Sequence, residues 1–274
     1  MSGFLLIGYL RNARSRLVEG LETVMHIIGI VSQKGGSGKT TLSGHLAVEA
    51  ERVGAGPVAL VDTDPQGSLS EWWNARAAET PRFARTSPAQ LAESIDQMRE
   101  MGIKLLIIDT PPAIEGTITD VIRISDLVII PVRPSPHDLR AVGATVDIVE
   151  KLGKQMIFVV NGATPRARIT NEAIMALSQH GTLAPVIVHH RTGFAASMID
   201  GRTVSEIKGD DRSAHEVALL WEYVNNRLSG NYQTVLSPHL FSAPPIDTSK
   251  PVPTVVSAET FPAETYQESE TTTS

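Results

Sequence analysis

Six short apolar runs, each separated from the next by an amphipathic stretch, most strongly limit what this chain can fold into. The runs are continuously apolar and do not alternate with polar residues, which is typical of strands buried on both faces. Strands and helices that alternate at this spacing predict a mostly parallel sheet flanked by helices on both faces. We therefore predict a single α/β domain.

The predicted elements follow from the apolar runs and from the periodicity between them. The predicted strands are residues 27–31, 58–62, 105–109, 127–132, 156–160 and 186–188. The predicted helices are residues 39–53, 68–78, 88–101, 115–124, 136–152, 170–180 and 213–228.

Composition divides the chain into three zones. Residues 1–24 are an extension, which we interpret as disordered or as the result of a wrongly assigned start codon, with Met25 as the true start. A helix that lies on a membrane is the alternative. Residues 25–229 form the predicted domain. Residues 230–274 are rich in Pro, Ser, Thr and Glu and have no periodicity, which predicts a disordered tail.

Charge and cysteine content exclude several classes of protein. The chain has no cysteine, so disulfides and cysteine-ligated zinc or iron–sulfur centres are excluded, and a reducing, cytoplasmic location is expected. A net charge of −6 argues against a broadly basic surface, but residues 231–274 carry −4 of it, which leaves room for a local basic patch. No apolar run approaches the length that spans a bilayer, so stable membrane insertion is not expected.

The segment QKGGSGKTT, residues 33–41, lies between the first predicted strand and the first predicted helix. Backbone N–H groups of such a glycine-rich loop bind phosphate at a helix N-terminus. Lys39 is the expected phosphate-binding catalytic lysine, and Thr40 would place its hydroxyl on Mg²⁺. The ordinary pattern GxxxxGK[ST] has glycine where this chain has Gln33, and the segment instead matches KGGxGK[ST]T. The predicted nucleotide-binding residues are Gly35, Gly36, Ser37, Gly38, Lys39, Thr40 and Thr41.

Three acidic residues fall at the ends of predicted strands. Asp62 and Asp64 follow the second strand, and Asp109 ends a later one. Ligands of open parallel sheets bind at the carboxyl ends of the strands, so we expect these carboxylates to converge beside the loop. One of them could hold Mg²⁺ through its water shell, and another could orient an attacking water.

Taken together, KGGSGKTT, VDTDPQGS and IIDTPP resemble the ParA/MinD family of deviant Walker ATPases, and most of all the small ParA-type partition ATPases. The resemblance runs from about residue 26 to about residue 228 and includes RPSPHDLRA (133–141) and RTGFAASMIDGRTVSE (191–206). It implies a P-loop NTPase fold with ATP and Mg²⁺ as cofactors. It also implies Mg²⁺-dependent ATP hydrolysis that is slow until a partner protein stimulates it.

The resemblance also assigns roles to individual residues. Lys34 matches the lysine that reaches across a dimer to the partner's nucleotide, when two subunits enclose two ATP molecules. Asp64 matches the residue that positions the hydrolytic water, and Asp62 and Asp109 match acids near the metal. Asn161 matches a position that often contacts adenine, although the residues after it, GATPR, depart from the commoner basic continuation.

The ParA-type ATPases that the chain resembles bind DNA without sequence preference. The resemblance implies that Arg191, Arg202 and Arg212 contact DNA here. The implied function is the partition of a plasmid or chromosome by a nucleoid-associated ATPase, with a ParB-like or other adaptor that stimulates hydrolysis. One alternative is the positioning of a protein cargo, such as a carboxysome, on the nucleoid. Another is a membrane-cycling ATPase like MinD, but the acidic, proline-rich tail lacks the amphipathic basic helix it needs.

Overall fold

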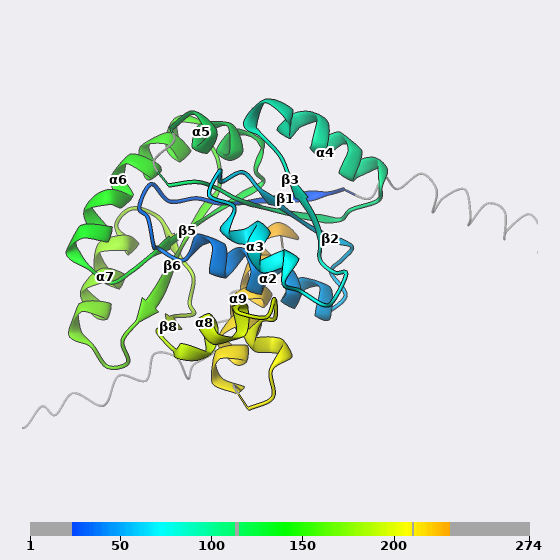
Figure 1. Cartoon of the computed structure of the whole chain (residues 1–274). Helices are drawn as coiled ribbons and strands as arrows, with labels where there is room; N and C mark the ends of the chain where they lie inside the picture. Colours follow the sequence, from blue (N-terminus) through cyan, green and yellow to red (C-terminus); the bar gives the residue numbers. More distant parts are fainter. Residues whose placement is uncertain (1–23, 113–114, 210, 231–274) are drawn as a thin grey trace, which may run out of the picture. The chain divides into compact units, whose positions relative to one another are not determined.

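The computed structural model describes residues 24–112, 115–209 and 211–230, whose arrangement is shown in Figure 1. The extension up to residue 23 and the tail from residue 231 lie outside the described residues, so the predictions made for them stay predictions. The strands of the described part are β1 (His26–Ile30), β2 (Val58–Asp62), β3 (Arg82–Arg85), β4 (Leu105–Asp109), β5 (Leu127–Val132), β6 (Met156–Ala163), β7 (Thr182–Leu183) and β8 (Val188–His189).

The helices of the described part alternate with these strands along the chain. They are α2 (Lys39–Arg52), α3 (Ser68–Asn74), α4 (Leu91–Glu100), α5 (Glu115–Ile124), α6 (Pro136–Lys151), α7 (Arg168–Ser178), α8 (Thr192–Met198) and α9 (Asp211–Leu228). Two short 3₁₀ turns, η1 (Pro88–Gln90) and η2 (Val204–Glu206), precede α4 and α9 respectively.

The strands form one sheet in the order β3-β2-β4-β1-β5-β6-β7, with β8 also paired to β6. Every one of these strand pairs is parallel, which confirms the predicted sheet. The parallel register places Asp109 of β4 beside both Ile30 of β1 and Asp62 of β2. The ends of β1, β2 and β4 therefore meet at one edge, where the phosphate loop begins.

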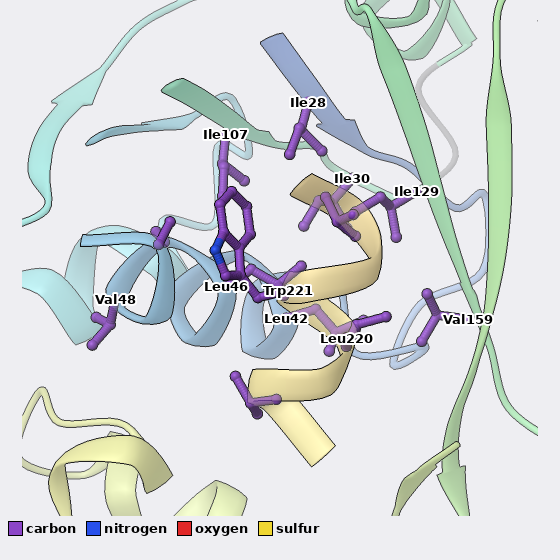
Figure 2. Packing of buried hydrophobic residues seen from close by; sticks show 14 of the residues in the cluster. Ile28, Ile30, Leu42, Leu46, Val48, Ile107, Ile129, Val159, Leu220 and Trp221 are labelled. Carbon is purple, nitrogen blue, oxygen red and sulfur yellow. The ribbon is translucent and has the colours of Figure 1, made fainter. Parts of the chain in front are cut away.

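Each face of the sheet has its own apolar core, because successive strand side chains point to opposite faces. On one face, Ile28 and Ile30 of β1 share a buried cluster with Leu46 of α2 and Trp221 of α9 (Figure 2). On the other face, Ile27 belongs to a second cluster that includes residues of α4, α5, α6 and α7 (Figure 1). Burying each such aliphatic side chain contributes roughly 1.5–3 kcal/mol. The loop between β1 and α2 is therefore anchored at both ends in buried structure.

Several predicted boundaries are corrected by the structure. The predicted helix 68–78 ends at Asn74, and the predicted helix 88–101 is the 3₁₀ turn η1 followed by α4. The strands β3 and β7 and the helix α8 were not predicted. None of the helices in the described part of the chain is long and apolar enough to cross a membrane.

Candidate nucleotide-binding site

The loop between β1 and α2 is shaped by two glycines with left-handed backbone. Gly36 has a φ of +75° and Gly38 a φ of +97°, which other residues rarely adopt. A side chain at Gly38 would also run into Nδ2 of Asn161, which donates a 2.7 Å hydrogen bond to the Ser37 carbonyl. The chain therefore enters α2 through a tight turn, with the first N–H groups of the helix left as the anion-binding groups.

Lys39 is the first residue of α2, and its side chain turns back along the loop. The residue is only 7% exposed, and its Nζ donates a 3.4 Å hydrogen bond to the Lys34 carbonyl. Burial lowers the pKa of Lys39, and the carboxylates of Asp109 and Asp64 oppose this shift. A phosphate next to this partly dehydrated ammonium would favour its charged form.

Asp109 ends β4 and faces the first turn of α2. One carboxylate oxygen accepts a 2.7 Å hydrogen bond from Thr40 Oγ1, and the other accepts one of 3.2 Å from Ser43 Oγ. Burial raises the pKa of Asp109 to about 7; the hydrogen bond from Thr40 opposes the rise, and the nearby charge of Asp62 adds to it. A cation beside this buried carboxylate would favour its ionised form.

The two acids of β2 and its following turn differ in their surroundings. Asp62 is fully buried: one oxygen accepts hydrogen bonds from the N–H and the hydroxyl of Ser70, and the other accepts from the Asp64 N–H. Asp62 therefore holds the first turn of α3 in place. The carboxylate of Asp64 is only partly buried and accepts a 2.9 Å hydrogen bond from the Gln66 N–H. Of the two, Asp64 is the one that lines the pocket described below.

Residues present here fit a magnesium ion, because Mg²⁺ prefers oxygen ligands and keeps several waters. The Thr40 hydroxyl and the Asp109 carboxylate are oxygen donors 2.7 Å apart at the start of α2. Within the described ranges, no three His, Cys, Asp or Glu side chains are grouped so that they could hold a metal ion. Thr40 as a direct ligand and Asp109 through water would thus share the ion with phosphate oxygens.

A pocket of about 600 Å³ opens in front of the loop, within the size range of small-molecule sites. It is lined by the loop and the start of α2, by the turn after β2 and α3, by the end of α8, and by one residue each from the segments after β4 and β5. The lining residues are Gly35, Gly36, Gly38, Lys39, Thr40, Thr41, Asp64, Ser68, Glu71, Trp72, Ala75, Pro112, Arg133, Met198 and Ile199.

Of the residues predicted for the nucleotide and the metal, Asp62 and Asp109 lie behind this pocket, and Ser37, Asn161 and Lys34 do not line it either. Ser37 and Asn161 are buried and bonded to each other, so the Asn161 amide supports the loop in this structure. Its predicted contact with adenine stays a prediction. Lys34 contributes its carbonyl to the loop, but its side chain is exposed and does not line the pocket.

The arginines predicted to contact DNA have unequal surroundings. Arg191 forms two hydrogen bonds of 2.6 and 2.7 Å with the Glu216 carboxylate. Arg202 pairs with Asp200 at 2.6 Å, whereas Arg212 is exposed in the first turn of α9. A carboxylate partner reduces the net positive charge that an arginine offers to a DNA phosphate. The predicted DNA contacts stay predictions.

Ser43 is a residue of the site that the sequence motifs missed, and several residues that line the pocket were not predicted either. Ser43 donates hydrogen bonds to the Asp109 carboxylate and to the Lys39 carbonyl. It lies four residues after Lys39 and therefore on the same face of α2. That spacing from the phosphate lysine is the signal that could have identified it.

Comparison with known proteins agrees with this geometry. The family model described as "CobQ/CobB/MinD/ParA nucleotide binding domain" matches residues 28–235. The chain belongs to this family. The resemblance to ParA and MinD is therefore confirmed, and ATP and Mg²⁺ agree with the nucleotide-binding role of this ATPase family.

Individual members of the CobQ/CobB/MinD/ParA family show how far the similarity extends. The "Maintenance of carboxysome distribution protein A" of Halothiobacillus neapolitanus is 29% identical over 203 residues, which are 68% of this chain and 90% of that protein. The "Protein ParA" of Rhizobium radiobacter is 29% identical over 181 residues, which are 64% of this chain and 73% of that protein.

A solved structure confirms the predicted P-loop fold. The septum site-determining protein MinD of Pyrococcus horikoshii, complexed with Mg-ADP, superimposes with a TM-score of 0.63. The match covers 76% of this chain and 98% of that structure at 19% sequence identity. At this identity the likeness establishes the fold alone.

Proposed function

We propose that this chain is an ATP-dependent switch that pairs with a second copy of itself around two ATP molecules. The observation that carries this proposal is the different placement of the two loop lysines. Lys39 lines the pocket of its own chain, whereas the exposed side chain of Lys34 does not. A cation at the rim of one phosphate site is suited to the phosphates of a facing subunit, as an arginine finger is. Two-fold symmetry then gives each subunit the other's Lys34.

Within each pocket, each residue has a separate role in ATP hydrolysis. Bound Mg²⁺ would neutralise charge on the phosphates, with Thr40 and Asp109 holding the ion. Lys39 and the first N–H groups of α2 hold the phosphates and stabilise the charge that develops as the terminal phosphate leaves. Asp64 orients the attacking water and accepts its proton. The Lys34 of the second subunit completes the site only in the dimer.

Nucleotide state and pairing are then coupled. If ATP favours the dimer, the dimer favours ATP by the same free energy, and hydrolysis reverses both. A partner protein that stimulates hydrolysis would separate the subunits. The chain would thus be a slow, Mg²⁺-dependent ATP hydrolase that acts as a timer.

The ATP-bound dimer would bind DNA without sequence preference. Pairing doubles every basic contact that one subunit offers to DNA phosphates, so the ATP-bound dimer binds DNA more tightly than the monomer. We propose that the dimer rides on the nucleoid and that a ParB-like adaptor connects it to a plasmid or chromosome. The similarity to the Rhizobium radiobacter ParA supports this assignment.

A protein cargo is the second candidate, and a specific similarity favours it. The match to the carboxysome distribution protein covers 90% of that protein. The same ATPase cycle would serve a protein cargo if the adaptor binds a protein assembly in place of a DNA site. Deleting the gene in the host distinguishes the two, because only a DNA cargo predicts an increased rate of plasmid or chromosome loss.

Replacing Lys34 with Ala is expected to abolish ATP-dependent pairing, because the dimer then lacks its cation in trans. Sedimentation or light scattering with a non-hydrolysable ATP analogue measures pairing, and a filter assay on nonspecific duplex across a salt series measures DNA binding. We expect DNA binding with ATP to weaken at least about tenfold, in line with the loss of a charge-assisted contact. Lys151→Ala, at the exposed end of α6, is the matched control.

Pairing of Lys34→Ala at the wild-type ATP concentration would contradict the role in trans. If the wild-type dimer bound DNA in no nucleotide state, ATP-dependent pairing would still stand but the proposed DNA binding would be wrong. Binding of that dimer to anionic lipid vesicles would then favour the membrane-cycling alternative.

A further inference from the structure

We infer that Arg133 is a phosphate-binding residue of the nucleotide pocket, and that it makes the pocket favour a triphosphate over a diphosphate. Arg133 belongs to no nucleotide-binding motif of the sequence, and it stands at the start of RPSPHDLRA, directly after β5. The inference rests on the proposed function and names the part of ATP that this residue recognises. Four features of the structure support the inference: the fixed backbone of Arg133, the path of its side chain, its unpaired charge and its position in the pocket.

The backbone of Arg133 is held in a fixed position. Strand β5 is paired between β1 and β6, so its end lies beside the phosphate loop. The Arg133 carbonyl accepts a 2.7 Å hydrogen bond from the Ser135 N–H, and Ser135 caps α6 by accepting from the Asp138 N–H. Pro134 and Pro136 restrict the same turn, because a proline ring fixes its own φ. The side chain of Arg133 therefore starts from a rigid point.

The side chain crosses two glycines on its way to the loop. A Cβ atom added at Gly162 would lie 3.7 Å from Cγ and Nε of Arg133, and one added at Gly36 would lie 3.9 Å from its Nη1. Gly162 and Gly36 have φ values of +67° and +75°. The stem thus passes over the end of β6, and the guanidinium reaches the first half of the phosphate loop.

The guanidinium has no counter-ion in the described part of the chain. Arg76, Arg191 and Arg202 are paired with carboxylates there, but no carboxylate of the described residues lies within 4.0 Å of the Arg133 guanidinium. Nor does the guanidinium donate a hydrogen bond to any described residue. A guanidinium presents a planar set of donors that matches a phosphate in two-point contact. An unpaired one that lines a phosphate pocket is therefore suited to a phosphate.

The position of the guanidinium selects the terminal phosphate. The N-terminus of α2 would hold the inner phosphates and Lys39 would reach from them to the terminal one, and both lie beyond Gly38. Arg133 lines the pocket at Gly36, two residues before that helix N-cap, while Asp64 lines the same pocket from the turn after β2. A γ-phosphate would lie between these groups, and a diphosphate would leave Arg133 without its ligand.

Affinities of purified protein for a non-hydrolysable ATP analogue and for ADP, both with Mg²⁺, test the inference. Arg133→Met keeps an unbranched apolar side chain over Gly162 and Gly36 and removes the charged guanidinium group. We expect it to weaken binding of the triphosphate about 10- to 100-fold and that of ADP less than about threefold, as for loss of a charge-assisted hydrogen bond. Arg133→Lys should recover part of the loss, because it restores the charge without the guanidinium group. Arg140→Met, at an exposed arginine of α6 outside the pocket, is the matched control and should change neither affinity.

Equal losses for the triphosphate and for ADP would overturn the inference, and so would unchanged affinities. Arg133 shares a chain with the pocket it serves, so its effect should not vary over a tenfold range of protein concentration, unlike that of Lys34. An effect confined to high protein concentration would likewise overturn the assignment to its own pocket. If the wild-type protein bound neither nucleotide, the proposed function would fail first and this inference with it. Retained ADP binding shows that each variant is folded.

Discussion

Replacing Asp64 with Asn is expected to slow ATP hydrolysis about 10²- to 10⁴-fold, the usual range for removing a general base, while ATP still binds. The substitution changes little else. The Asn side-chain oxygen can still accept the hydrogen bond that Asp64 receives from the Gln66 N–H, so the turn after β2 is kept. Because Asp64 attracts Lys39, its neutralisation leaves the lysine freer to bind phosphate. The variant should therefore accumulate as the ATP-bound dimer.

Single-turnover hydrolysis and ATP affinity, measured on the same preparation, separate the two effects. Asp147→Asn, at an exposed position of α6, is the matched control and should hydrolyse ATP at the wild-type rate. Hydrolysis by Asp64→Asn at more than about a tenth of the wild-type rate would mean that another group activates the water.

Replacing Asp109 with Asn is expected to stabilise the nucleotide-free protein at neutral and alkaline pH and to remove Mg²⁺-dependent hydrolysis. The pKa of Asp109 is about 7 in the folded protein and 3.8 for an unperturbed aspartate. Between these two values the folded state keeps a proton that the unfolded state has lost, so wild-type stability falls as pH rises from about 4 to about 7. Above pH 7 the cost is complete, at about 4 kcal/mol for a shift of this size. Asn carries no charge at any pH and avoids that cost.

Urea unfolding at pH 5 and at pH 8, without Mg²⁺ and nucleotide, measures the predicted difference. The gain in the free energy of unfolding should be larger at pH 8 than at pH 5. Asp62→Asn is the control: its two carboxylate oxygens accept from the Asp64 and the Ser70 N–H groups respectively, and Asn replaces one of them with an NH₂ group that cannot accept, so the protein should be destabilised at both pH values. An Asp109→Asn protein that is no more stable than wild type at pH 8 would show that the buried carboxylate costs nothing.

The strands of the interior were predictable because their burial on both faces leaves a continuous apolar run. The edge strand β3 was not, because it begins and ends with arginine; it forms by parallel pairing with β2, and its Phe83 stacks on Trp73 at 5.3 Å between ring centroids. That contact joins residues of two separate elements and leaves no local pattern. Helix α8 has only seven residues and contains Gly193, so its periodicity is too short to detect.

In the candidate site too, the features formed by neighbouring residues were predictable and those formed by distant segments were not. The phosphate loop could be predicted because neighbouring residues form it, and each glycine serves a local backbone requirement. The capping of α3 by Asp62 and the reach of Arg133 to Gly36 depend on how distant segments meet in the folded sheet. Such contacts have no fixed spacing along the chain, and only the structure reveals them.

The central claim is that each ATP site is completed by the Lys34 of a second copy. Mixing two inactive variants tests it most directly. Lys34→Ala keeps a complete pocket but has no lysine to offer, and Asp64→Asn offers its lysine but cannot hydrolyse ATP. In a 1:1 mixture each mixed pair has one complete site, so ATP hydrolysis should rise well above that of either variant alone. A mixture as inactive as its two components would contradict the claim.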